Sequence, residues 1–156
     1  MMATPQASSS ARADGLRLAI VASRFNGAVV EKLVAGAVAE IEKRGGDRPA
    51  VLWVSGALEL PLVAQRVAKE WNLNAVVCLG CVIEGGTDHY EHVCRATVDG
   101  LMRVSLDTGI PVGNGVLTVK SLAQAEDRAG GAVGNKGAEA AEAAIDAARV
   151  LQGIGR

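Results

Sequence analysis

The chain has 156 residues, of which 49% are hydrophobic and only 3% aromatic, so a core of this size must be built from aliphatic side chains and alanine. Its formal net charge of −1 lacks the basic excess of nucleic-acid binders and gives no reason to expect an anionic membrane as partner. The longest apolar-or-glycine run, residues 75–83, is far too short to cross a bilayer.

Residues 1–14 are small, polar and rich in serine, which predicts a disordered tail ahead of a single domain over residues 15–156. This tail has no apolar segment of the kind that a secretory signal needs. The three cysteines are odd in number and lie in apolar or helical surroundings. We therefore expect reduced thiols and a cytoplasmic location.

The first third of the domain predicts a strand, a helix and a second strand. Residues 16–22 form an aliphatic run typical of a strand buried on both faces, and the turn RFNG follows at 24–27. Apolar residues then recur at spacings of three and four as far as Ile41, which predicts a helix that ends at the glycine pair 45–46. The second strand is expected over 50–54.

The middle of the chain continues the alternation. The turn at 55–57 leads into a helix to about residue 71, with Pro61 in its first turn, where a missing N–H costs little. The apolar run 75–83 predicts the third strand, and a helix is expected from about residue 88 to 107.

The last third predicts one strand and two helices. The strand is expected over 111–117. Ser121 begins a short helix with Gln124 three residues on, which is a capping-box pattern. The glycine-rich stretch 130–137 ends it, and the alanine-rich segment 138–151 predicts the final helix.

Four strand–helix units with one extra helix predict a three-layer α/β/α sandwich around a four-stranded parallel sheet. Ligands of such sheets bind at the carboxyl ends of the strands. The turns RFNG, SGALE and EGGTDH and the segment around Asn114 are therefore expected to converge on one site.

The stretch GCVIEGGTDHYEHV, residues 80–93, is nearly a phosphate-binding loop. A P-loop has lysine where this chain has Gly86, and Gly80 lies inside the apolar strand run, so a triphosphate is not expected. The backbone N–H groups at Gly86 and Thr87, the Thr87 hydroxyl and the helix start suit one small phosphate monoester. The alternative is a glycine turn capped by Thr87 with no ligand.

His89 falls in the first turn of the following helix, and its imidazole can move protons near neutral pH. His92 lies one turn further, so H-x-x-H raises the question of a metal. A metal would need a further protein ligand, and the sequence shows none at a useful spacing. We expect no metal and interpret His92 as a surface or interface residue.

Cys78 and Cys81 form C-x-x-C, a spacing that opens a helix in redox proteins but falls inside a predicted strand here. Strand residues three apart face opposite sides of the sheet. Both cysteines are therefore interpreted as small core residues.

Two other side chains, Glu59 and Phe25, lie at the expected rim of the site. Glu59 at the second helix start complements the helix dipole and also suits hydroxyl groups of a ligand. Phe25 sits in a turn rather than in the core, where it can stack on a planar ring. Arg128 and Lys136 flank the glycine-rich break, and each alone is interpreted as solvated charge.

Together these turns resemble the lumazine synthase family, whose members make 6,7-dimethyl-8-ribityllumazine, the precursor of riboflavin. The match extends from about residue 16 to 151. It rests on five segments in family order and spacing: RFN at 24–26, SGALELP at 55–61, GCVIEGGTDHYEHV at 80–93, PVGNGVLT at 111–118 and RAGGAVGNKGAEAA at 128–141.

The resemblance implies a flavodoxin-like sheet and a transferase that joins 5-amino-6-(D-ribitylamino)uracil to 3,4-dihydroxy-2-butanone 4-phosphate. An amine condenses with the ketone, phosphate leaves, and the ring closes. No cofactor is implied, because imine formation and elimination supply the chemistry. The single phosphate is the group that the glycine-rich turn would hold.

The same resemblance implies residue roles. His89 would be the proton shuttle, Phe25 would stack on the pyrimidine, and Lys136 would approach the ring carbonyl. Gly86, Thr87 and Arg128 would bind the phosphate, with Arg128 and Lys136 supplied by a neighbouring subunit. The other implied substrate-binding positions are Gly56, Ala57 and Glu59 at the ribityl chain, the backbone of Val82 and Ile83 at the pyrimidine edge, and Asn26 and Asn114.

Two positions depart from the family pattern. Glu84 stands where the family usually has Arg or Lys, which puts negative charge near the expected phosphate. Asn114 stands where Phe is frequent, so an aromatic lid over the pyrimidine would be lost. A non-catalytic lumazine or flavin carrier and a structural shell protein are the alternatives to an enzyme.

The resemblance also implies a homo-oligomer. Family members form pentamers, and the short connection between Arg128 and Lys136 favours the icosahedral shell of 60 subunits over the free pentamer. Riboflavin synthase is a candidate partner.

Overall fold

The computed structural model describes residues 9–155. In chain order its elements are β1 (Leu18–Ser23), α1 (Gly27–Lys43), β2 (Ala50–Val54), the 3₁₀ turn η1 (Ala57–Glu59), α2 (Leu60–Glu70), β3 (Ala75–Ile83), α3 (His89–Thr108), β4 (Val112–Val119), α4 (Leu122–Asp127), β5 (Ala129–Gly131), β6 (Gly134–Asn135) and α5 (Lys136–Ile154).

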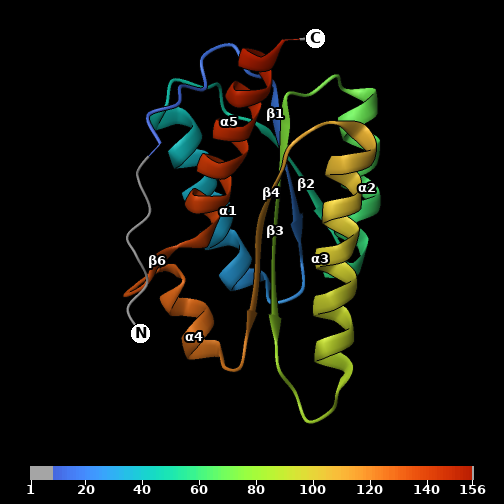
Figure 1. Ribbon diagram of the computed structural model, residues 1–156. Coiled ribbons are helices and arrows are strands. Elements are labelled where there is room, and N and C mark those ends of the chain that lie inside the picture. The colour runs from blue at the N-terminus through green and yellow to red at the C-terminus, as the bar shows by residue number, and fades with distance from the viewer. Residues whose placement is uncertain (1–8, 156) are drawn as a thin grey trace, which may run out of the picture.

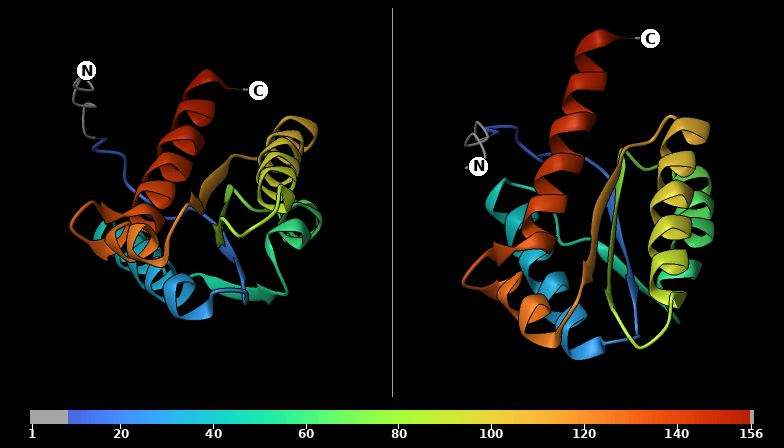
Figure 2. Two further views of the ribbon diagram at one scale, coloured as in Figure 1. Left: turned by 90° about the horizontal axis from the view of Figure 1, so that it is seen from below. Right: turned by 60° about the horizontal axis from the view of Figure 1, so that its bottom comes forward.

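The four long strands form one parallel sheet in the order β2-β1-β3-β4. Helices α1 and α5 cover one face and α2 and α3 cover the other, as Figure 1 and the two views of Figure 2 show. The predicted three-layer sandwich with a four-stranded, flavodoxin-like parallel sheet is confirmed. All four strands point the same way, so the turns that follow β1, β2 and β3 meet at one edge of the sheet.

Strand β3 lies in the interior of the sheet, between β1 and β4, which is why its sequence is apolar on both faces. Side chains alternate between the two helix layers, so Cys78 packs on the α2/α3 side and Cys81 on the α1/α5 side. Burial raises the pKa of the Cys78 thiol to about 12 and that of Cys81 to about 11. Both are buried core residues, as predicted.

The helix ends follow local sequence signals. Gly45, just after α1, has a φ of 91°, a backbone conformation that glycine adopts without steric cost. Pro61 sits in the first turn of α2. The Ser121 hydroxyl accepts a hydrogen bond from Gln124 N–H at 3.2 Å, while the Gln124 side chain reaches the N–H of Lys120.

Two segments differ from the sequence expectation. The glycine-rich stretch is not only a break: β5 and β6 form a small antiparallel hairpin, and α5 begins two residues earlier than predicted, at Lys136. The hairpin was missed because its strands are too short to show an alternating pattern.

Residues 9–14, which were expected in the disordered tail, lie against α1 and α5, while residues 1–8 lie outside the described part of the chain. The Arg44 side chain donates to the Ser9 and Ala11 carbonyls and pairs with Glu142 at 3.1 Å. The Arg149 side chain donates to the Asp14 carbonyl at 2.7 Å. An arginine just after α1 and another on α5 thus fasten this segment.

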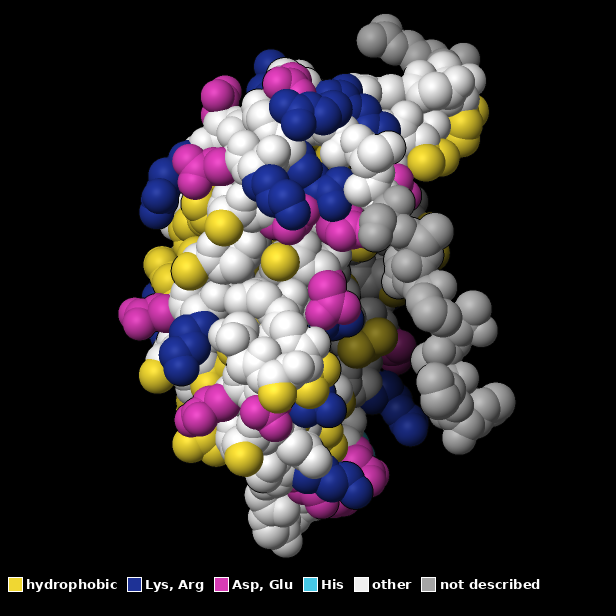
Figure 3. All heavy atoms as spheres, turned by 90° about the vertical axis from the view of Figure 1, so that its left-hand side faces the viewer, with side chains coloured by type: hydrophobic (Ala, Val, Ile, Leu, Met, Phe, Trp, Pro, Cys, Tyr) yellow, Lys and Arg dark blue, Asp and Glu magenta, His cyan; other side chains and the backbone are white. Residues whose placement is uncertain are grey.

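Basic and acidic side chains are interspersed on the face that carries α1 and α5, without a stripe of one sign (Figure 3). This distribution agrees with the formal net charge of −1. No helix within residues 9–155 is both long and apolar enough to cross a membrane.

Candidate active site

A pocket of about 390 Å³ opens at the carboxyl ends of β1, β2 and β3. Strands β2 and β3 lie on opposite sides of β1 in the sheet, so the strand order reverses direction next to β1. Such a switch in strand order leaves a crevice between neighbouring turns. The lining residues are Phe25, Gly56, Ala57, Leu58, Glu59, Cys81, Val82, Ile83, Gly85, Thr87, His89, Tyr90 and Val93.

The turn after β1 supplies the aromatic wall. The backbone N–H groups of Arg24 and Phe25 donate to the Val54 and Ser55 carbonyls at 2.8 and 3.1 Å, which fastens the turn to the end of β2. Phe25, the only phenylalanine of the chain, is 71% exposed, although a large apolar side chain is more often buried. An exposed ring held on a fastened turn is available to stack on a planar ligand.

The turn after β2 supplies a carboxylate. One Glu59 oxygen accepts a hydrogen bond from the Gly56 N–H at 3.1 Å, so Glu59 caps the 3₁₀ turn η1. The side chain remains exposed at the pocket wall. Its structural role as a cap therefore leaves acceptor capacity for hydroxyl groups of a ligand.

The turn after β3 supplies a hydroxyl and an imidazole. Gly85, Gly86 and Thr87 are exposed, and His89 is the first residue of α3. The positive end of the helix dipole lies here and favours an anion. This turn can therefore bind an anion beside a proton-transfer group.

Several lining residues were not predicted from the sequence. Tyr90 and Val93 line the pocket from the first turns of α3, and Leu58 lines it from η1. Desolvation first, and then the neighbouring Cys94 thiol, raise the pKa of Tyr90. The available signal was the helical spacing of Tyr90 and Val93, which puts them on one face of α3.

Five expected site residues do not line the pocket, and three of them are Gly86, Asn26 and Asn114. Gly86 lies between two lining residues of the same turn. The Asn26 side chain donates to the Cys81 carbonyl at 2.8 Å. Asn114 lies in the first half of β4, opposite Cys78 and away from the carboxyl end, and its side-chain oxygen accepts from the Val116 N–H at 3.0 Å.

Arg128 and Lys136 also lie away from the pocket of their own chain. They flank the β5–β6 hairpin, which lies with α4 on the α1 side of the sheet, whereas η1 and α3 lie on the other side (Figure 1). The hairpin brings the two residues together, because the Lys136 N–H donates to the Arg128 carbonyl at 2.8 Å. Two cationic residues are thus adjacent on a different part of the surface.

The two histidines have different surroundings. The His92 side chain is 77% exposed and lies 3.4 Å from the Asp88 carboxylate, one turn away on α3. His89 faces the pocket, and His92 does not line it. Within residues 9–155 no three His, Cys, Asp or Glu side chains are grouped as a metal would require.

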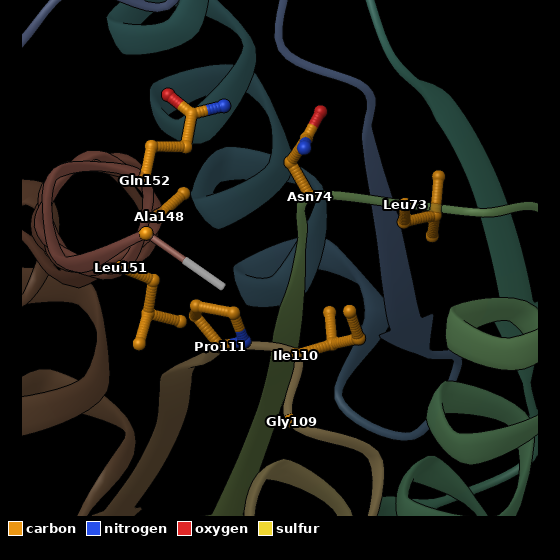
Figure 4. A pocket seen from close by; sticks show the side chains of 9 residues that line it. Leu73, Asn74, Gly109, Ile110, Pro111, Ala148, Leu151 and Gln152 are labelled. Atoms are coloured by element: carbon orange, nitrogen blue, oxygen red, sulfur yellow. The ribbon is translucent and has the colours of Figure 1, made fainter.

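A second cavity, of about 350 Å³, opens at the opposite end of the sheet between the α3–β4 connection and the end of α5 (Figure 4). Leu73, Ile110, Pro111 and Leu151 give it apolar walls, Asn74 and Gln152 add polar groups, and none of the lining residues within 9–155 is ionisable. Of these two cavities, the one at the carboxyl ends combines an imidazole, a carboxylate and a glycine-rich turn at a helix start, so it is the candidate active site.

A parallel α/β sandwich with a pocket at its switch point defines a flavodoxin-like protein. The chain belongs to the 6,7-dimethyl-8-ribityllumazine synthase family, whose model matches residues 15–152. It is also 44% identical over 142 residues to the 6,7-dimethyl-8-ribityllumazine synthase of Nitratidesulfovibrio vulgaris, covering 90% of this chain and 91% of that protein. The family predicted from the sequence is confirmed.

Proposed function

We propose that the pocket at the carboxyl ends of β1–β3 is where this chain performs the reaction of its family. That reaction condenses 5-amino-6-(D-ribitylamino)uracil with 3,4-dihydroxy-2-butanone 4-phosphate and releases 6,7-dimethyl-8-ribityllumazine and phosphate. The observation that carries the proposal is the pocket lining, which joins Phe25, Glu59, Thr87 and His89 from three separate turns.

Each group matches one part of the two substrates. The exposed Phe25 ring stacks on the pyrimidine, and the Glu59 carboxylate accepts hydrogen bonds from ribityl hydroxyls. The backbone of Ile83, on the free edge of β3, bonds the pyrimidine edge, and Val82 lines the pocket beside it. Thr87 and the amino end of α3 hold the phosphate until it leaves.

Proton transfer is assigned to His89. Imine formation requires a proton at the departing ketone oxygen. Loss of phosphate requires removal of a proton from the carbon between the imine carbon and the carbon that bears the phosphate. An imidazole beside the anion-binding turn can serve both steps, because it exchanges protons near neutral pH. His89 lies two residues from Thr87 and lines the same pocket.

The cationic half of the phosphate site comes from a neighbouring subunit. Arg128 and Lys136 are adjacent to each other yet distant from the pocket of their own chain. A head-to-tail contact between subunits brings the hairpin of one to the pocket of the next, and such contacts close into rings. We infer a pentamer that assembles into a 60-subunit icosahedral shell, located in the cytoplasm, with riboflavin synthase as a partner.

The direct test mixes both substrates with the protein and follows the fluorescence of the lumazine together with phosphate release. Equal molar formation of both products supports the enzyme. Binding of the lumazine without turnover would instead support a carrier, the alternative raised by Glu84 and Asn114.

A further inference from the structure

Strand β3 extends beyond its neighbour β1 at the pocket. The last paired residues of the two strands are Ala22 and Leu79, whereas β3 continues to Ile83 and stays paired with β4 throughout. Gly80–Ile83 therefore have an edge without a strand partner on the β1 side. This edge borders the pocket that Cys81, Val82 and Ile83 line.

The backbone direction of this edge follows from the alternation of a strand. The Glu84 N–H donates to the Val119 carbonyl at 2.9 Å, so residue 84 faces β4. Successive residues direct their N–H and C=O groups to opposite sides. The backbone groups of Cys81 and Ile83 consequently face away from β4, toward the pocket.

Asn26 occupies the first of these positions. Its side-chain amide donates to the Cys81 carbonyl at 2.8 Å, over a separation of 55 residues. The carbonyl is an acceptor only, so the contact requires a donor. Two residues further along the same edge, the Ile83 N–H and C=O remain without a strand partner among residues 9–155.

The rest of Asn26 is committed to the start of α1. Its carbonyl accepts from the Val29 and Val30 N–H groups at 3.1 and 3.2 Å, and its φ of 55° and ψ of 42° are left-handed. Asparagine tolerates this conformation better than most side chains and also carries a donor. Glycine meets only the first requirement, and aspartate lacks the donor when ionised.

We propose that Asn26 is a positioning residue, which holds the free edge of β3 so that the Ile83 backbone groups face the pyrimidine substrate without Asn26 itself touching that substrate. The inference rests on the proposed function, because the pyrimidine is the ligand that would hydrogen-bond to the backbone of this edge. It differs from the expectation that Asn26 binds substrate directly.

Two substitutions separate the hydrogen bond from the backbone conformation. Asn26→Gly keeps the left-handed turn and removes the amide. Asn26→Asp keeps the shape and replaces the donor by a carboxylate that repels the Cys81 carbonyl. The matched control is Arg24→Ala, which removes the side-chain hydrogen bond at 2.9 Å from the same turn to the Trp53 carbonyl of β2.

Steady-state kinetics with each substrate varied in turn gives the readout. We expect Asn26→Gly to raise the KM for the ribitylamino-uracil about three- to tenfold, the scale of one hydrogen bond, and Asn26→Asp to raise it further. The KM for the butanone phosphate should stay within about twofold, since that substrate does not use this edge. Arg24→Ala should leave both KM values near those of the unchanged protein.

The outcomes are decisive. A fall in kcat of the Asn26 variants with both KM values unchanged would mean that Asn26 acts at the reacting atoms. An equal rise of both KM values in the Asn26 variants, or a rise of the KM values in Arg24→Ala, would mean a general loosening of the turn. Either result overturns the inference, as does no change at all. If the unchanged protein neither turns over nor binds the lumazine, the proposed function has failed, and that failure is visible before any variant is made.

Discussion

The Thr87 hydroxyl accepts a hydrogen bond from the backbone N–H of His89 at 3.3 Å. A hydroxyl that accepts this bond keeps its own O–H proton to donate. Thr87 can therefore cap the amino end of α3 and bind an anion simultaneously. The bond fixes the Thr87 hydroxyl relative to the backbone of His89, the residue that carries the imidazole.

His89→Ala should slow turnover without unfolding the protein, because the side chain is exposed. General acid–base help commonly contributes about 100- to 10,000-fold, and imine chemistry places the expected loss near the low end. The control is His92→Ala, since His92 lies on the same helix outside the pocket. An unchanged kcat in the His89 variant would remove its assigned role.

Much of the fold could be predicted because the strands are apolar runs bounded by glycine and polar turns. The predicted bounds of β2 and β3 coincide with those observed. The first strand starts at Leu18 rather than at residue 16, because Leu16 is buried ahead of the sheet without joining its ladder. Burial and strand pairing give the same signal in a sequence, so the two could not be separated.

The site was harder to predict than the fold. Turn residues such as Glu59 and His89 could be assigned to one edge because all parallel strands end there. The contact between Asn26 and Cys81 depends on how many residues β3 extends beyond the end of its pairing with β1, which the sequence does not specify. Tyr90 was missed because an aromatic residue on a helix is ordinarily a core residue.

Arg128→Ala should weaken the butanone phosphate far more than the ribitylamino-uracil. A hydrogen bond to a charged group is worth roughly 1.5–3 kcal/mol, or about ten- to a hundredfold in affinity. The Arg128 side chain also donates to the Gln124 carbonyl at 3.0 Å, so Arg128→Lys is a useful companion variant that keeps the charge. Equal losses for both substrates would make Arg128 a structural residue of α4.

Glu84→Arg should tighten the binding of the butanone phosphate. Glu84 is exposed and immediately precedes Gly85 of the anion-binding turn, so its carboxylate repels a phosphate there. Glu84→Gln, which removes the charge without reversing it, should give an intermediate KM, and both effects should shrink at high salt. Weaker binding in the arginine variant would mean that Glu84 does not lie beside the phosphate.

Gly137→Ala should lower the free energy of unfolding by about 1–3 kcal/mol, the usual cost of overpacking. A methyl group at Gly137 would overlap the Leu33 carbonyl where α5 crosses α1. The control lies on the same helix: no atom of residues 9–155 lies within 4 Å of a Cβ added at Gly153, so Gly153→Ala should be neutral or stabilising. Melting both variants at one protein concentration makes the comparison, and equal melting temperatures would show that the crossing can open without cost.

The shared site can be tested by complementation between two impaired variants. His89 lines the pocket of its own chain, whereas Arg128 lies elsewhere on that chain. If each site takes His89 from one subunit and Arg128 from the next, co-assembling His89→Ala with Arg128→Ala subunits restores some complete sites. With random mixing in a head-to-tail ring, roughly one site in four has both residues.

The expected result is activity well above the sum of the two separate variants, measured after subunits have been dissociated and reassembled together. Mixed rings must first be demonstrated with a tag on one variant. A second mixture, His89→Ala with subunits that carry both substitutions, contains no subunit with an intact His89 and should recover nothing. If mixed rings form and the first mixture also stays inactive, each chain must carry its own complete site, and Arg128 would have to reach the pocket within one subunit.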